Sequence, residues 1–174
     1  HQEQQRLLNE NFGYKSAIVP SCYEAPITNE PGAKKKIIWV STLRKWKRPE
    51  LFIKLAHSIP QAQFQMIGGP ALGTQGEKYY DVIAGLCKDV PNLEFVGFVP
   101  YNEIDGYFDG ASMLINTSEA EGFPNTFLQA WSRGMPVIYF PNQTGSIGGK
   151  NPSVTVINFK ELVQTVEKLW SDHT

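Results

Sequence analysis

Short apolar runs alternate with helical patterns over most of the chain. Six runs rich in β-branched and aromatic residues predict strands at 36–41, 63–67, 93–96, 113–116, 137–140 and 154–157. Between them, apolar residues recur at helical spacing, most clearly over 159–170, and Pro49 suits the first turn of a helix. Because nearly continuous apolar strands alternate with helices, the pattern predicts an α/β fold, with a doubly wound, Rossmann-like parallel sheet covered on both faces.

Residues 1–33 do not follow this alternation, and we interpret them as an interdomain lead-in or linker. The pattern favours a short amphipathic helix over 4–11 and a strand over 16–20, and turn-forming residues are frequent over 21–33. We therefore expect one domain at 34–174.

Composition narrows the function classes. A net charge of −1 lacks the basic excess of a nucleic-acid binder, and two cysteines are too few for a disulfide framework. No apolar run approaches the roughly 20 residues of a membrane-spanning helix, and the polar start is not a signal peptide. These features favour a protein of the cytoplasm, which is a reducing environment. Cations gather over 34–54, whereas 89–131 holds carboxylates without Lys or Arg, which indicates a localised anion site.

In a doubly wound sheet, ligands bind outside the carboxyl ends of the strands, so the loop after each strand is a candidate. Gly68 and Gly69 would let backbone approach a ligand or would simply form a turn, and the residues leave both open. They complete neither a dinucleotide fingerprint nor a P-loop. The loop over 44–48 is either a solvated basic surface or a phosphate site, since Lys47 lies next to a helix start at Pro49.

The loop after the fourth strand is the most informative. The segment EGFPNT at 121–126 leads into an apolar helix that Gly134 is expected to end. Glu121 lies in the loop, Gly122 permits close backbone approach, and Gln129 lies about one turn into the helix. Composition alone leaves an ordinary strand-to-helix loop with an exposed acid as the simpler interpretation.

The stretch SEAEGFPNTFLQAWSRGMPVI at 118–138 resembles the signature of the retaining, GT-B-fold glycosyltransferases of group 1 (family 4). In that family, a Glu-Gly-Phe-Gly/Pro segment is followed by a second Glu eight residues after the first and by a Gly-x-Pro-Val tail. Four further segments resemble the family in its order: 9–21 (interdomain), 34–56 (first strand and lysine loop), 66–70 (Gly-rich turn) and 93–104 (base-proximal strand and turn).

The resemblance implies roles position by position. It gives Glu121 contacts to donor-sugar hydroxyls and Lys47 neutralisation of the diphosphate, which makes these two the expected catalytic residues. Val99 lies in the turn that meets the nucleotide base through backbone groups. The remaining donor-binding positions that match are the Gly-rich turn and the loop amides: Gly68, Gly69, Gly122, Phe123, Pro124, Asn125 and Thr126.

Two positions depart from the family pattern. The second glutamate, which in the family binds ribose hydroxyls, is Gln129 here, and loss of charge assistance predicts donor binding weaker by about 1 kcal/mol. Thr42 occupies the place of an arginine that would pair with Lys47 on the diphosphate. Arg44, two residues on, is our hypothesised replacement, because an extended chain would turn it the same way.

The resemblance implies the C-terminal, donor-binding half of a hexosyltransferase-type retaining enzyme of polysaccharide biosynthesis, which moves a sugar from a nucleotide-diphosphate sugar to an acceptor hydroxyl. The family's N-terminal acceptor-binding domain is not in this sequence, so the fragment alone is expected to be inactive. No cofactor or metal is expected. The expected partners are the nucleotide-sugar donor and that acceptor domain, with no nucleic acid. The expected location is cytoplasmic, and at most peripheral to the inner face of the membrane through the missing half.

The residues also leave open a function of a different class. Thr42 and Gln129 replace charged residues of the family, so a degenerate, non-catalytic GT-B domain kept for binding or assembly is the alternative. A GT-B epimerase or phosphorylase half is disfavoured by the EGFPN segment and by the lack of a specific candidate for a pyridoxal-phosphate lysine.

Overall fold

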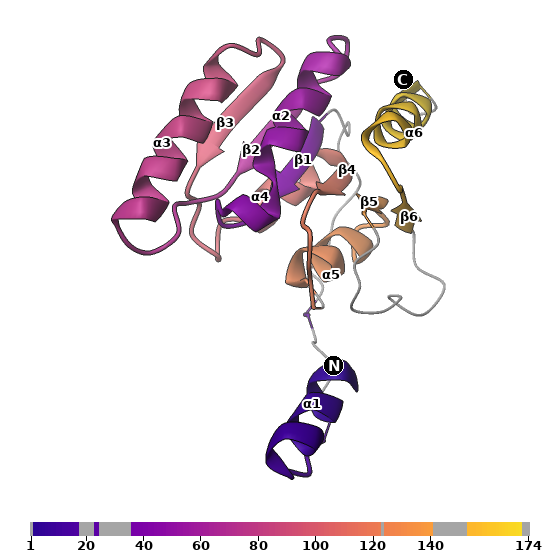
Figure 1. The fold of residues 1–174 in the computed structure, drawn as a ribbon. Helices are drawn as coiled ribbons and strands as arrows, with labels where there is room; N and C mark the ends of the chain where they lie inside the picture. Colours follow the sequence, from indigo (N-terminus) through magenta and orange to yellow (C-terminus); the bar gives the residue numbers. More distant parts are fainter. Residues whose placement is uncertain (1, 18–22, 25–35, 123, 141–152, 172–174) are drawn as a thin grey trace.

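Six parallel strands form the centre of the computed structural model, which describes residues 2–17, 23–24, 36–122, 124–140 and 153–171 (Figure 1). They are β1 (Lys36–Val40), β2 (Phe64–Ile67), β3 (Leu93–Gly97), β4 (Ala111–Asn116), β5 (Val137–Tyr139) and β6 (Ser153–Thr155). The order across the sheet is β3-β2-β1-β4-β5-β6, and every neighbouring pair is parallel. All six predicted strands are confirmed, and so is the doubly wound topology.

Helices lie between successive strands from β1 to β5, as the helical spacing predicts, and one further helix precedes β1 and one follows β6. They are α1 (Gln2–Phe12), the 3-10 helix η1 (Lys45–Lys47), α2 (Pro49–Ser58), α3 (Thr74–Lys88), α4 (Asp105–Asp109), α5 (Asn125–Trp131) and α6 (Phe159–Ser171). Pro49 is the first residue of α2, as predicted. The sequence pattern did not reveal α4, because five residues flanked by turns are too short for a helical period.

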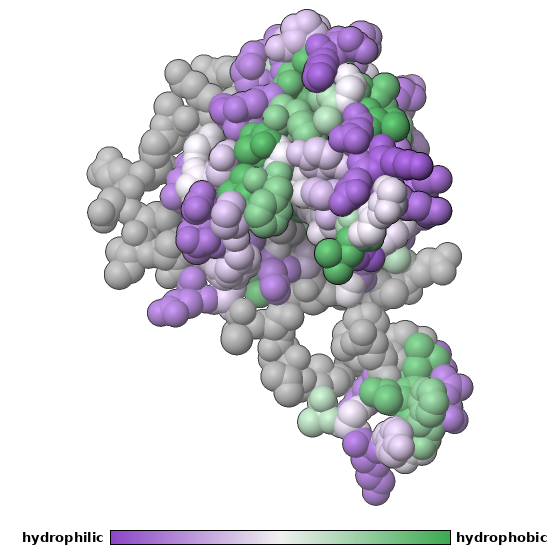
Figure 2. All heavy atoms as spheres, turned by 90° about the vertical axis from the view of Figure 1, so that its left-hand side faces the viewer, coloured by the Kyte–Doolittle hydropathy of each residue, from purple (hydrophilic) through white to green (hydrophobic). Residues whose placement is uncertain are grey.

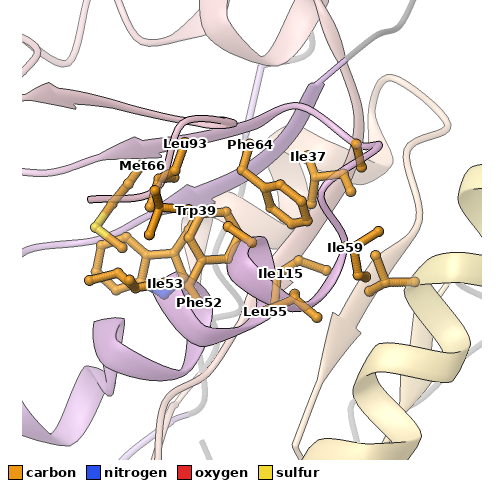
Figure 3. Close-up of a cluster of buried hydrophobic side chains, with 14 of the residues drawn as sticks. Ile37, Trp39, Phe52, Ile53, Leu55, Ile59, Phe64, Met66, Leu93 and Ile115 are labelled. Carbon is orange, nitrogen blue, oxygen red and sulfur yellow. The ribbon is translucent and has the colours of Figure 1, made fainter. Parts of the chain in front are cut away.

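Strand residues alternate between two separate cores. Ile37 and Trp39 of β1 face a cluster covered by α2, α3 and α6, and Figure 3 shows the two side chains within it. Ile38, between them, faces a second cluster covered by α4 and α5. Both faces of the strand are therefore buried, which is why its sequence is apolar without interruption.

The lead-in is described only in part. The helix predicted over 4–11 is confirmed as α1, which lies apart from the sheet (Figure 1). Figure 2 shows apolar side chains exposed on this separate helix. Leu7 and Phe12 of α1 are both exposed. The strand predicted over 16–20 does not include Ser16 or Ala17, and its other residues lie outside the described part. The boundary between residues 33 and 34 stays a prediction.

Asn92 joins the end of α2 to the start of β3. Its buried Nδ2 donates to the carbonyl oxygens of Ala56, Ile59 and Ala62 at 2.9, 3.0 and 2.9 Å. We expect Asn92→Ala to lower the free energy of unfolding by about 2 kcal/mol, because it leaves buried carbonyls without this donor. Urea unfolding measures the change. Asn102→Ala, at an exposed loop position, is the control, and equal midpoints for the two variants would contradict the prediction.

Candidate functional site

The strand order places the topological switch point of the sheet between β1 and β4. The chain leaves β1 toward α2 on one face of the sheet and leaves β4 toward α5 on the other. The two loops therefore separate at the carboxyl edge, and this topological switch point is where doubly wound sheets bind their ligands. The loop after β1 holds Lys47, and the loop after β4 holds Glu121.

The structure brings Lys47 and Glu121 together at this switch point. Lys47 Nζ donates to Glu121 Oε1 at 2.5 Å, although the residues are 74 positions apart. The same oxygen accepts hydrogen bonds from Ser118 Oγ at 2.6 Å and from Asn116 Nδ2 at 3.2 Å. The two charged side chains are only 13% and 11% exposed. A cation and an anion held this close, and largely out of water, form the electrostatic centre of the site.

The loop that carries Lys47 turns sharply. After η1, Arg48 adopts left-handed backbone (φ 51°, ψ 51°), and Pro49 then starts α2. The Lys47 ammonium lies 4.1 Å from the ring centroid of Trp46. Thr42 and Arg44 are exposed on the same loop, and Arg44 has extended backbone. That conformation is compatible with the hypothesis that Arg44 replaces the missing arginine, which stays a prediction.

The Gly-rich turn after β2 packs against the chain that leaves β1. Leu43 N donates to Gly69 O at 2.9 Å, and an added Cβ at Gly68 would lie 1.9 Å from the carbonyl oxygen of Ser41. A Cβ at Gly69 would lie 2.8 Å from the ring of Phe98. The chain's own packing therefore accounts for glycine at position 68, where the close atom belongs to the backbone, whereas the exposed Phe98 ring can move away from position 69. The assignment of Gly68 and Gly69 to the donor stays a prediction.

The loop before α5 is described except for Phe123, so that predicted contact lies outside the described residues. Gly122 and Asn125 are exposed, and Pro124 has extended backbone just before the helix. Thr126, at the start of α5, is half-buried, as is Val99 in the loop after β3. Their proposed contacts with a donor stay predictions.

Gly134 ends α5 as predicted. It has a φ of 65°, and the amides of Gly134 and Met135 donate to the carbonyls of Trp131 and Ala130 at 3.0 Å each, the two bonds of a Schellman motif.

Gln129 is 2% exposed and belongs to a polar cluster between α4 and α5. Its Nε2 donates to Asp105 Oδ1 at 3.3 Å, and the same oxygen accepts from Arg133 at 3.1 Å and from the Tyr23 hydroxyl at 2.6 Å. Arg133, whose side chain is 4% exposed, also donates to Asp109 at 2.6 Å. Burial raises the pKa of Tyr23, a direction consistent with its hydroxyl donating to Asp105.

Sequence reasoning found Gln129 but missed the residues that surround it. Asp105 precedes Gln129 by 24 positions, and Tyr23 precedes Asp105 by 82. No periodic pattern links residues so far apart. The one available signal was the pair of acids at Asp105 and Asp109, four residues apart and so on one side of a helical turn.

The described parts of the chain contain no group of three or more His, Cys, Asp or Glu side chains placed to hold a metal ion. None of the helices in these parts is both long and apolar enough to cross a membrane. The expectation that no metal or other cofactor takes part stays a prediction.

Comparison with known families decides the identification. The family model of the glycosyl transferases group 1 matches residues 24–146, more than half of the 174-residue chain. The chain belongs to this family. The match spans the loops after β1 and β4, including Lys47 and Glu121.

Two curated proteins of Escherichia coli are similar to this group 1 chain: the O-antigen biosynthesis glycosyltransferase WbnH and the probable O-antigen biosynthesis glycosyltransferase WbiN. Each is 26% identical over an alignment of 137 positions, which covers 74% of this chain and 36% of the relative. The chain thus spans about a third of the length of the relatives that it matches.

Solved glycosyltransferase structures share the fold. Anabaena HepE, solved in complex with UDP and glucose, superposes with a TM-score of 0.64 at 20% identity, over 80% of this chain and 40% of HepE. S. aureus TarM, solved with UDP among its ligands, gives a TM-score of 0.67 at 16% identity, over 99% of this chain and 37% of TarM. These matches confirm that the chain has the Rossmann-like architecture of a GT-B half.

Proposed function

We propose that the chain is the donor-binding half of a retaining glycosyltransferase that transfers a sugar, of the hexose type, from a nucleotide-diphosphate sugar to an acceptor hydroxyl. The observation that carries the proposal is the contact between Lys47 and Glu121 at the switch point of the sheet. The two charges come from different loops and meet where a doubly wound fold binds its ligand.

The pair suits a ligand that combines a dianion with hydroxyl groups. In the proposed complex, the diphosphate takes Lys47 as its counter-ion, and Glu121 Oε1 then accepts hydrogen bonds from hydroxyls of the sugar. Stabilising the leaving diphosphate lowers the barrier to breaking its bond to the sugar, and low water access strengthens the interaction. The partial exposure of both side chains supports such a site.

The acceptor and the other half of the cleft are also part of the proposal. The chain covers 36% of WbnH and 40% of HepE, so we infer that an acceptor-binding domain of the same protein completes the site. By the same reasoning, we expect this half alone to bind a donor without transferring sugar, because alignment and exclusion of water need both walls of the cleft. WbnH acts in O-antigen biosynthesis, and we propose a polysaccharide product and a cytoplasmic site of action here.

Calorimetric titration with UDP, GDP and ADP tests the proposal, with uridine as a ligand that lacks the diphosphate. UDP is the first choice, because the HepE and TarM structures hold it. We expect saturable binding of one diphosphate and at least about tenfold weaker binding of its nucleoside, since charge-assisted hydrogen bonds are lost. No binding of any diphosphate at millimolar concentration would instead support the non-catalytic alternative.

A further inference from the structure

Thr117, the first residue after β4, is a buried hydrogen-bond link between the core and the Lys47 loop. Thr117 is 0% exposed. Thr117 Oγ1 donates to the carbonyl oxygen of Lys47 at 2.6 Å and accepts from Trp39 Nε1 at 2.9 Å. Trp39 belongs to β1 and is fixed in the large hydrophobic cluster (Figure 3). A continuous series of hydrogen bonds therefore runs from the core through Thr117 to the backbone of Lys47.

A second bond joins the same two loops. The amide of Glu119 donates to the carbonyl oxygen of Trp46 at 2.9 Å, next to the bond from Thr117 to Lys47. Ser118, between Thr117 and Glu119, donates to Glu121. The segment 117–119 thus holds the backbone of the lysine loop and also orients the carboxylate that faces the lysine.

The lysine loop needs such an anchor. A lysine side chain is flexible, so the position of its ammonium depends on how firmly the backbone beneath it is held. Arg48 turns the chain through left-handed backbone immediately after Lys47, and Pro49 has no N–H to donate. The Thr117 hydroxyl therefore supplies a hydrogen bond to the Lys47 carbonyl where η1 ends and the chain turns into α2.

We infer that Thr117 is a positioning residue for Lys47 in nucleoside diphosphate binding, and that the indole N–H of Trp39 orients the Thr117 hydroxyl. The inference rests on the proposed function for its ligand. Only a hydroxyl can accept from the indole and donate to the carbonyl through one atom, so serine can replace threonine here and valine cannot. The two bonds also strengthen each other, because each polarises the shared hydroxyl.

The test compares Thr117→Val and Thr117→Ser with the unmodified chain by UDP titration, with thermal unfolding measured in parallel. We expect Thr117→Val to weaken UDP binding about tenfold, since a misplaced charge loses much of its interaction, and Thr117→Ser to restore it to within about threefold. In a Lys47→Ala background, Thr117→Val should cost no further affinity. Unchanged UDP affinity in Thr117→Val, or an equal loss in the Lys47→Ala background, would overturn the inference.

A second measurement does not depend on the nucleotide. Acylation of lysine amines, followed by mass spectrometry, reports how well each ammonium is held. Lys47 should react severalfold faster in Thr117→Val than in Thr117→Ser or the unmodified chain, whereas the exposed Lys45 should react equally in all three. If the unmodified chain binds no diphosphate, the proposed function fails, but this labelling still decides whether Thr117 positions Lys47. Equal Lys47 labelling in all three proteins would overturn that role.

Discussion

Replacing Lys47 with alanine is expected to weaken UDP binding by about 100-fold, the larger of the effects foreseen here. Two losses combine. The diphosphate loses its counter-ion, and Glu121, which in the unmodified protein contacts Lys47 at 2.5 Å, is left facing the incoming dianion. Repulsion by the Glu121 carboxylate, which has lost its contact with the ammonium, therefore adds to the missing attraction. Calorimetric titration with UDP measures the change.

The loop supplies matched controls for this experiment. Lys45→Ala removes an exposed cation from the same 3-10 helix and should change the UDP affinity by less than about threefold, as expected for a screened surface charge. Adding Glu121→Gln to Lys47→Ala should recover part of the affinity, because it removes the repulsion. If Lys47→Ala behaved like Lys45→Ala, Lys47 would not be the counter-ion of the diphosphate.

The same titration decides the role of Arg44. If Arg44 replaces the arginine that Thr42 displaced, Arg44→Ala should weaken UDP binding by an amount between those of Lys45→Ala and Lys47→Ala. Unchanged affinity in Arg44→Ala, beside a large loss in Lys47→Ala, would show that the hypothesised replacement is wrong.

Gln129→Glu is the second substitution with a large expected effect. From the sequence, restoring the family's glutamate should tighten donor binding. The structure favours the opposite result, because the Gln129 amide donates to Asp105 Oδ1 at 3.3 Å in a site where Gln129 is 2% exposed. A carboxylate there would face that of Asp105, so we expect the unfolding free energy to fall by about 2 kcal/mol and UDP affinity not to improve.

Exchanging the two groups separates repulsion from general disruption. The double variant Asp105→Asn/Gln129→Glu removes the repulsion between the two carboxylates, but Asp105 Oδ1 also accepts from Arg133 and Tyr23, so the exchange should recover only part of the lost stability. Gln164→Glu, at an exposed position of α6, controls for a new negative charge and should be nearly neutral. Urea unfolding of the unmodified chain, of Gln129→Glu, of Asp105→Asn and of the double variant gives the four free energies of unfolding that the comparison needs. Tighter UDP binding in Gln129→Glu alone would favour the sequence-based expectation instead.

The elements of the fold were predictable because their signals are local. A strand with both faces buried has an apolar run of a few residues, as β1 does. A helix with one buried face has apolar residues every three to four positions, as α6 does. Pro49 and Gly134 mark a helix start and a helix end through their own backbone preferences. Alternation of these elements then implies a parallel sheet, and a parallel sheet implies where ligands bind.

The contacts within the site were not predictable in this way. Lys47 and Glu121 were each selected by resemblance, but their contact depends on β1 and β4 being neighbours in the sheet. The partners of Gln129 and the link from Trp39 through Thr117 join residues 24 to 78 positions apart. Strand order and register decide which side chains meet across such separations. Patterns that repeat every two to four residues carry no information about either.

For this protein, the sequence by itself determined the α/β class, the elements, and the loops on which functional residues lie, because each depends on interactions between near neighbours in the chain. Only the tertiary structure decided that Gly68 is required by the carbonyl of Ser41, that Gln129 pairs with a carboxylate, and that Thr117 supports Lys47. Those outcomes depend on packing between distant segments, where one hydrogen bond or one close approach changes what a residue can do.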